Sequence, residues 1–367
     1  MGRATLKDVA SAAKVSTTTV SHALNGTRYV RPATRDRIQM VAAELAYRPD
    51  PIARALQGQD TLLVGYITSN LVTNAFYAQV ARGADRRAQE LGFAMVLASV
   101  DDNAEAERKA VHLLLEKRVG GIIFNPPKAV ENVTLAVNAG IAAVMIERPW
   151  PVIGAHAVIT DHHRALYSLT TLLLEQGHHQ IAFIGGDIAL AGGAIVEQPR
   201  LRGFQDALKD AHLRAPAAHI VLVPYGMDTA RAACRQVLDA SPQPSALVVG
   251  SDLLAAGVLQ VLYERRLRIP DDISVVSFDD TLGPYLAPPL TEAEPAVEEM
   301  GRAAVELIAT QRRQPDDQPL QPQRVVLQAR LHLRASTRAV PPSGTDTLPH
   351  QTATSPAGPD PAPTVCS

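Results

Sequence analysis

The segment between residues 61 and 338 carries the pattern that most constrains the fold, because short apolar runs alternate there with stretches of helical periodicity. The runs have the length and β-branched content of buried strands: LLVGYI at 62–67, FAMVLAS at 93–99, GIIF at 121–124, AAVMI at 142–146, QIAFIGG at 180–186, ALVVGS at 246–251 and ISVVSFD at 273–279. Helical spacing separates them, for example at 77–91 and 105–116. This alternation predicts an α/β fold of doubly wound parallel sheets, whose ligands bind beyond the carboxyl ends of the strands.

The beginning of the chain differs from this body in charge. Residues 1–59 hold nine Lys or Arg against four Asp or Glu, a net charge of +5, whereas the whole chain carries −2. The remainder is therefore acidic. A small basic head on a larger acidic body is typical of a protein whose head alone meets a polyanion.

Three short amphipathic helices fit this head. Thr5 can cap the first, Ser16 can cap the second, and the third begins near Pro32, since proline suits a first helical turn. Two short helices joined by a tight turn, with a third closing the core, form the helix-turn-helix arrangement. We therefore predict an all-α DNA-binding domain over residues 1–49.

The second of these helices lies in the stretch VSTTTVSHALNG, where three threonines occupy its start although threonine is a mediocre helix former. The first residues of a recognition helix point into the DNA major groove, where Thr17 and Thr18 can hydrogen-bond to bases and His22, about one turn on, can reach a base edge. Phosphate contacts are expected from the short polar residues Ser16, Thr19 and Ser21. The alternative is that the threonines are only a polar cap on a solvated helix.

The whole stretch TLKDVASAAKVSTTTVSHALNGTRYVRPATRDRIQMVAAELAYRPDPIARAL resembles the N-terminal domain of the lactose repressor family of bacterial regulators. The pattern is closest to the purine-type and ribose-type repressors. The match is long and nearly gapless. The resemblance implies that Thr17, Thr18 and His22 read bases in the major groove and that Arg28 supports this contact from the following loop.

Residues 50–60 form a separate segment. Asp50 is a good N-cap and Pro51 a good first-turn residue, but the helix they predict is barely over one turn long and should not persist alone in water. The resemblance implies a hinge helix that folds when two subunits meet over DNA, with Leu56 inserted between base pairs in the minor groove. The alternative is an ordinary linker that contains a leucine.

The resemblance continues through the body to about residue 338, in EQGHHQIAFIGG, RLRGFQDAL and SDLLAAGVLQVLYERRLRIPDDISVVSFDD. It implies a domain similar to periplasmic sugar-binding proteins, in which two lobes of residues 61–338 enclose an effector cleft and mediate dimerisation. Arg200 and Asp279 match the residues that grip ligand oxygens and accept from ligand hydroxyl or amine groups. Further candidates are Phe76 and Tyr77, which match stacking aromatics, and more weakly Asp161, Tyr225 and Asp252.

An aromatic face with a carboxylate and a guanidinium suits a polyhydroxylated small molecule. Purine-type repressors have an arginine and a threonine where this chain has Ala194 and Val196, so the sequence favours a sugar or sugar-like effector over a purine. Each residue also has a simpler interpretation. Arg200 can pair with a surface carboxylate, and Asp279 can belong to a polar turn after a buried strand.

The sequence gives little support for a metal site, a phosphate-binding loop or a catalytic centre. His162-His163 and His178-His179 do not predict a metal site, because adjacent histidines in a helix point to different faces and no cysteine or third histidine recurs at ligand spacing. No Gly-Lys-Ser/Thr follows the glycine pairs, and no nucleophile stands in a recognisable catalytic context. We therefore expect no enzyme activity and no cofactor.

The location of the chain is also constrained. The start, MGRATLKDVA, lacks the apolar core of a signal peptide, and no apolar run reaches membrane-spanning length. Cys234 and Cys366 make no disulfide framework, which favours a reducing compartment. We expect a cytoplasmic protein without a membrane partner, whose Pro-rich tail, residues 339–367, is disordered.

These features together predict a transcriptional regulator, most simply a repressor. Two related half-sites require two recognition helices, so the protein should bind a near-palindromic operator as a homodimer and respond to a small-molecule effector in the cleft. The alternative is a solute-binding protein of the sugar-transport type without a regulatory role. That alternative explains the body but needs an export signal and has no use for residues 1–60.

Overall fold

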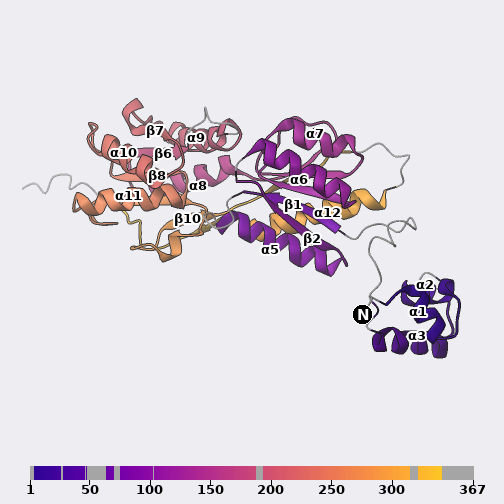
Figure 1. Ribbon diagram of the computed structural model, residues 1–367. Helices are drawn as coiled ribbons and strands as arrows, with labels where there is room; N and C mark the ends of the chain where they lie inside the picture. The colour runs from indigo at the N-terminus through magenta and orange to yellow at the C-terminus, as the bar shows by residue number, and fades with distance from the viewer. Residues whose placement is uncertain are drawn as a thin grey trace, which may run out of the picture.

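The computed structural model describes residues 4–25, 28–45, 47, 63–69, 75–101, 103–186, 193–314 and 321–340, without the side chains of 25 and 193–195. The predicted hinge at 50–60 with its Leu56 lies outside the described residues. Of the tail predicted at 339–367, residues 341–367 also lie outside them, but 339–340 are described and the prediction of disorder is wrong there, because the Val340 amide donates to the Gln176 carbonyl at 2.7 Å. Two regions of regular structure are described, a helical head and a larger α/β body (Figure 1).

The head consists of three short helices around one small core, as predicted. Helix α1 spans Leu6–Ala12, α2 spans Thr17–Asn25 and α3 spans Pro32–Glu44. Thr5 and Asp8 form a capping box at α1, which satisfies free amide groups at the helix start. Buried apolar side chains from all three helices make the core: Val9, Ala10, Ala13, Val20, Ala23, Val30, Ile38 and Ala42.

The body divides into two lobes, each built on a six-stranded sheet. The first sheet, which we call the N-lobe sheet, is parallel throughout, with strand order β11-β5-β4-β3-β1-β2. Its strands are β1 (Leu63–Thr68), β2 (Ala94–Ser99), β3 (Gly121–Asn125), β4 (Ala142–Ile146), β5 (His156–Thr160) and β11 (Arg324–Leu327).

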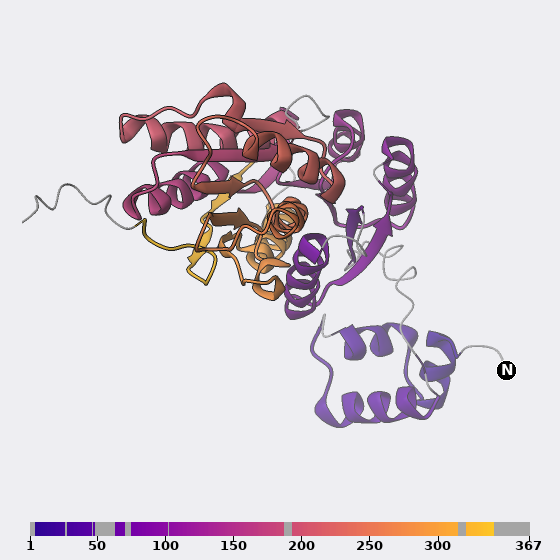
Figure 2. The same cartoon turned by 90° about the vertical axis from the view of Figure 1, so that its left-hand side faces the viewer.

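Helices cover both faces of the N-lobe sheet because its strands are apolar on both sides. Helices α5 (Ala75–Glu90) and α12 (Val297–Arg313) pack on one face, and α6 (Ala104–Glu116) and α7 (Val130–Asn138) pack on the other. Figures 1 and 2 both show α12 beside α5. Gly83 permits this close approach, since a Cβ there would lie 2.0 Å from the Glu298 carbonyl oxygen.

The second sheet, the C-lobe sheet, has the order β12-β10-β9-β8-β6-β7. Its strands are β6 (Ile181–Gly186), β7 (Ile220–Val223), β8 (Ala246–Val249), β9 (Ser274–Phe278), β10 (Thr291–Glu294) and β12 (Arg330–His332). Helices α8 (His162–Glu175) and α9 (Gly193–Asp210) cover one face, and α10 (Met227–Leu238) and α11 (Asp252–Glu264) cover the other. Short 3-10 turns lie at Ala217–His219 and Gly283–Tyr285.

The prediction of parallel sheets is confirmed with one exception, because edge strand β12 runs antiparallel to β10. The sequence pattern also missed β5, β7, β10, β11 and β12. Strands β10 and β12 read TEAE and RLH, so neither shows the apolar run of a buried strand. Their identity as strands comes from pairing with neighbours far away in the sequence.

The chain crosses between the lobes three times. It passes from β5 to α8 through Asp161, from β10 to α12 through 295–296, and from β11 to β12 through 328–329. Helix α12 and strand β11 therefore complete the N-lobe although they follow the C-lobe in sequence, as the orange α12 among purple elements shows in Figure 1. Within the described residues, no helix is both long and apolar enough to cross a membrane.

Candidate functional site

Helix α2 presents the polar residues predicted to contact DNA. Ser16, Thr17 and Thr18 are exposed, whereas Val20 and Ala23 on the opposite face are buried in the core of the head. The amide of Thr19 donates to Ser16 Oγ at 3.1 Å, so Ser16 caps the helix as predicted. The threonines at 17 and 18 thus have no role in the core of the head.

The remaining residues of the predicted DNA face lie in different environments. The hydroxyl groups of Thr19 and Ser16 are 2.8 Å apart, so each already has a hydrogen-bond partner within the helix. Ser21 and His22 are half-buried, and Arg28 is exposed in the segment before α3. Arg28 and the first turn of α2 are thus solvent-accessible, as a nucleic-acid contact requires.

In the body, Arg200 on α9 is the centre of a buried polar network. Only 5% of this residue is exposed. Its Nη1 donates to Glu197 Oε1 at 3.1 Å, to Tyr225 Oη at 2.9 Å and to the Gly250 carbonyl at 2.8 Å. The guanidinium also lies 4.3 Å from the centroid of the Phe278 ring. The alternative of a surface ion pair for Arg200 is therefore wrong.

Glu197 and Tyr225 complete the C-lobe side of this network. Glu197 is 1% exposed, accepts from the amide of Gly186 at 2.9 Å and accepts a short hydrogen bond from the Tyr225 hydroxyl. Tyr225 as a residue is 47% exposed, but desolvation of its hydroxyl raises its pKa well above the ordinary value; the Glu197 carboxylate adds to this shift and Arg200 opposes it. Tyr225 therefore stays protonated and donates.

The N-lobe side of the network centres on Glu147, the residue directly after β4. Its carboxylate accepts from the Thr160 hydroxyl at 2.6 Å and lies 2.7 Å from His162 Nε2. Burial alone would raise the pKa of Glu147, but the charge and hydrogen bond of His162 and the bonds from Thr160 hold it below its ordinary value. The carboxylate is thus ionised and hydrogen-bonded.

His162 joins the two halves of this network. It is the first residue of α8, directly after the first crossover, and Arg200 Nε donates to its Nδ1 at 3.3 Å. A continuous chain of polar contacts therefore runs from Glu147 of the N-lobe through His162 to Arg200 of the C-lobe. Side chains at the carboxyl ends of both sheets are thus in contact where the two lobes meet.

Asp279 lies beside this chain, directly after β9. Its backbone φ is +106°, a conformation that a non-glycine residue rarely adopts, and Glu147 has a φ of +61°. Within the described part of the chain, no hydrogen bond reaches the Asp279 carboxylate. Burial, followed by the charge of Asp252, raises the pKa of Asp279 well above its ordinary value. An acceptor without a partner at a strand end is available to a ligand.

Polar atoms without partners also occur on the N-lobe edge. Asn125, which ends β3, donates to the Tyr66 hydroxyl, but its Oδ1 is buried with no hydrogen-bond partner among the described residues. The same holds for Ser69 Oγ, directly after β1. Both lie at the carboxyl edge where the fold predicts a ligand.

The other predicted effector residues have contacts of their own. Asp252 Oδ2 accepts from the Thr281 amide and hydroxyl and from the Leu282 amide, at 2.6–2.8 Å, so it orders the loop after β9. Asp161 caps α8 through the amide of Arg164 at 3.0 Å. These contacts favour a positioning role for both aspartates over direct contact with a ligand.

The predicted aromatic pair lies at the start of α5. Phe76 is buried in the N-lobe core, and the half-buried Tyr77 packs edge-to-face against it at 5.6 Å between ring centroids. The preceding residues 70–74 lie outside the described chain. Val196, on α9, is half-buried, and the Ala194 side chain is not described.

Sequence reasoning missed Glu147, His162 and Glu197. The histidine was considered only as a metal ligand, and the two glutamates do not stand out from other acidic residues. The one available signal was position, since Glu147 follows the apolar run AAVMI directly and so lies at a strand end. In the second histidine pair, His178 bonds to Ser245 and Ser274 at 2.9 and 3.0 Å.

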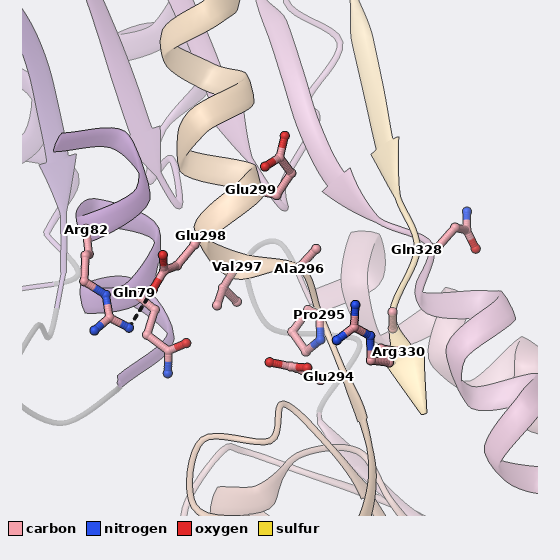
Figure 3. Close-up of a pocket in the computed structure, with 11 residues that line it drawn as sticks. Gln79, Arg82, Glu294, Pro295, Ala296, Val297, Glu298, Glu299, Gln328 and Arg330 are labelled. Carbon is pink, nitrogen blue, oxygen red and sulfur yellow. Dashed lines mark ion pairs between the residues drawn. The ribbon is translucent and has the colours of Figure 1, made fainter. Parts of the chain in front are cut away.

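A second cavity lies on the side of the body formed by the crossovers (Figure 3). It is a cleft of about 710 Å³. Arg82 of α5 and Glu298 of α12 form an ion pair of 2.7 Å at one end, and Glu294 and Arg330 lie at the other end (Figure 3). None of the predicted site residues lines it.

Comparison with known proteins agrees with this architecture. Residues 5–50 match the family described as bacterial regulatory proteins, lacI family, and residues 170–337 match the periplasmic binding protein-like domain. The HTH-type transcriptional repressor PurR of Vibrio atlanticus is 33% identical over 308 residues, which cover 83% of this chain and 91% of that protein. The ribose operon repressor of Escherichia coli is 31% identical over 336 residues, covering 91% of this chain and 99% of that protein.

A solved structure extends the similarity to the fold. The lac repressor dimer bound to operator and the anti-inducer ONPF has a TM-score of 0.77 and 27% sequence identity, covering 92% of this chain and 100% of that chain. The similarity therefore includes both the head and the two-lobed body. The chain belongs to the lacI family of bacterial regulatory proteins.

Proposed function

We propose that this chain is a cytoplasmic transcriptional repressor that binds a near-palindromic operator as a homodimer and is switched by a sugar or sugar-like effector between its lobes. The observation that carries the proposal is the buried chain from Glu147 through His162 to Arg200, which links the two lobes beside the free carboxylate of Asp279. A ligand at this point contacts both lobes at once.

A polyhydroxylated ligand fits the free groups of the cleft. The Asp279 carboxylate can accept from ligand hydroxyls, and the second terminal nitrogen of Arg200, which has no hydrogen bond to any described residue, can donate to them. Anionic ligands are disfavoured, because Glu147, Glu197 and Asp279 surround a single guanidinium. The name of the ribose operon repressor supports the sugar class by analogy.

The switch follows from the topology of the body. The lobes are joined by three crossovers, so a ligand that bridges the carboxyl edges favours their closed arrangement over the open one. In a dimer, closure alters the spacing of the two heads and releases or strengthens the grip on DNA. Such coupling is typically worth about 1–3 kcal/mol.

DNA recognition is assigned to the head. We propose that Thr17, Thr18 and His22 contact base edges, supported by Arg28, and that backbone positioning comes from the start of α2 with Ser16, Thr19 and Ser21. Because Ser16 and Thr19 are already bonded to each other, their phosphate contacts would use the remaining lone pairs or the helix amides. Leu56 would insert into the minor groove from the hinge.

The proposal is tested with the purified full chain by footprinting the DNA upstream of its own and neighbouring genes. Protection of two related half-sites is expected. Absence of protection would contradict the repressor function and favour the alternative of a solute-binding protein.

The effector is tested by thermal-shift screening of sugars, polyols and nucleobases. A sugar that raises the melting temperature should lose this effect in Asp279→Asn, whereas Asp206→Asn, a change at a half-buried residue of α9 that bonds to His163, should retain it. Both variants should still protect the operator. A hit that survives Asp279→Asn and Arg200→Ala unchanged would mean that the effector binds elsewhere.

A further inference from the structure

The end of the C-lobe sheet carries a cluster of charged side chains that the proposed function does not use. Glu292 and Glu294 lie two residues apart on β10 and therefore on the same face. His332 of β12 stands opposite Glu292 in the antiparallel pair, and Asp280 belongs to the loop after β9. One ligand atom each from Asp280, Glu294 and His332 lies within 4.8 Å of the others.

Glu292 provides a second, independent observation. It is fully buried, and neither of its carboxylate oxygens has a hydrogen-bond partner among the described residues. Ser277, its register partner on β9, also has a buried hydroxyl without a partner. Burying a carboxyl group with no partner is costly, so this position calls for a positive charge nearby.

The protein supplies that charge only in part. The nearest guanidinium to Glu292 is Arg334, at 3.8 Å, and it already donates to both oxygens of Asp280 at 2.5 and 3.0 Å. Asp280 and Glu292 thus share one arginine, whereas Glu294 is hydrogen-bonded to His332.

The donor set suits a transition-metal cation. His332 Nε2 and Glu294 Oε2 form a hydrogen bond of 2.7 Å, which a metal ion bound between them would replace. Carboxylate oxygens and one imidazole nitrogen together are suitable ligands for Mn²⁺ or Zn²⁺. Arg334 would orient the Asp280 carboxylate by hydrogen bonds, as residues next to a metal ligand commonly do.

A route from solvent to this cluster exists. Asp280, Glu294 and His332 are all half-buried, and Glu294 also lines the crossover cleft, where Figure 3 shows it beside Pro295 and close to Arg330. The cluster is thus accessible to an ion through a space much larger than a hydrated cation.

We propose that Asp280, Glu294 and His332 bind one divalent transition-metal cation, Mn²⁺ or Zn²⁺, with the buried Glu292 carboxyl group facing the same charge. The ion would tie the loop after β9 to strands β10 and β12, which lead into two of the three crossovers. Since Asp279 begins that loop, the metal would order the C-lobe side of the effector cleft. The binding site itself does not depend on the proposed repressor function.

The proposal is tested on the full chain after treatment with a chelator. Titration with Mn²⁺, followed by loss of the electron paramagnetic resonance signal of free Mn²⁺, and calorimetric titration with Zn²⁺ should each show one site per chain. Glu294→Gln and His332→Gln should each weaken binding at least about tenfold. The control His179→Gln, an exposed histidine of the same lobe, should bind like the original chain.

Glu292→Gln separates a metal site from a merely structural cluster. Glutamine cannot supply a carboxylate charge, so this variant should gain less stability than the original chain when Mn²⁺ or Zn²⁺ is added. The proposal is overturned if neither ion binds, if binding survives both Glu294→Gln and His332→Gln, or if added metal stabilises Glu292→Gln as much as the original chain.

Discussion

Helix α2 and the interlobe cleft both rely on polar side chains, but they differ in burial and in where each side chain finds its partner. On α2, Thr17 and Thr18 are exposed, and the capping bond between Thr19 and Ser16 spans three residues. In the cleft, the buried Arg200 bonds to groups 38 and 50 residues away in sequence. An exposed polar face can therefore be changed without loss of the fold, whereas a buried network cannot.

The largest expected effect comes from breaking the cleft network. Arg200→Met leaves the buried Glu197 carboxylate without its cation, which should lower the free energy of unfolding of the C-lobe by about 3–5 kcal/mol. Hydrogen exchange of the amides in β6 and α9 would measure this loss.

Two further variants sharpen that result. The double change Arg200→Met with Glu197→Gln should recover much of the stability, because no uncompensated charge remains. Arg214→Met, an exposed change in the same lobe, should stay within about 0.5 kcal/mol. If Arg200→Met behaved like this control, the cleft would not differ from the exposed face as we describe.

On the head, the largest expected loss of stability comes from the cap of α2. Ser16→Ala removes the oxygen that accepts from the Thr19 amide, which should cost about 1 kcal/mol of stability in the head. Thermal unfolding of α1 to α3, followed by NMR of the full chain, would measure it. An unchanged melting temperature would show that solvent replaces the cap.

Thr18→Ala tests the exposed face directly. Its effect on the stability of the head should be within about 0.5 kcal/mol, because the side chain is exposed and alanine favours helix. Operator affinity should fall by about 1 kcal/mol, with altered preference for the contacted base pair, measured by fluorescence anisotropy on base-substituted operators. Unfolding of the head would instead mean that the threonine is structural.

The smallest effect should appear in the pH dependence of the C-lobe. Burial lowers the pKa of His178, whereas the unfolded chain regains the ordinary value of 6.5. Below pH 6.5 the unfolded state therefore binds more protons than the folded state, so stability should fall as the pH falls through this value. Melting temperatures measured over about two pH units, from about pH 7.5 to about pH 5.5, would show this loss of stability.

His178→Gln should flatten this pH profile, whereas His112→Gln, on an exposed face of α6, should leave its slope unchanged. The protonation effect originates in the burial of His178, and its hydrogen bond to the Arg338 carbonyl opposes the effect. An equal slope in both variants would assign the pH dependence to other groups.

Much of the fold could be predicted from local pattern. The seven apolar runs are all strands, and the caps at Thr5 and Ser16 begin the expected helices. Strands β10 and β12 were missed because TEAE and RLH contain no apolar run, so they resemble loops. Strand β12 pairs with β10 only because the chain returns from the N-lobe to the C-lobe. A local sequence pattern cannot predict this return.

The candidate sites also contain residues that could be predicted from the sequence and residues that could not. Arg200 and Asp279 were predicted by resemblance, but their surroundings were not: Glu147, Glu197 and His162 complete the network, and Asp252 orders a loop. The sequence argued against a metal site because no spacing suggested one. The structure brings Asp280, Glu294 and His332 together from a loop and two strands.

The seven apolar strands, the basic head and the exposed threonines of α2 could be predicted from the sequence alone, because periodicity, capping and surface charge are properties of neighbouring residues. Which polar side chains are buried together between the lobes and at the end of the C-lobe sheet became clear only from the folded chain. Burial and pairing depend on contacts between residues far apart in the chain, and the three crossovers are what bring those residues into contact.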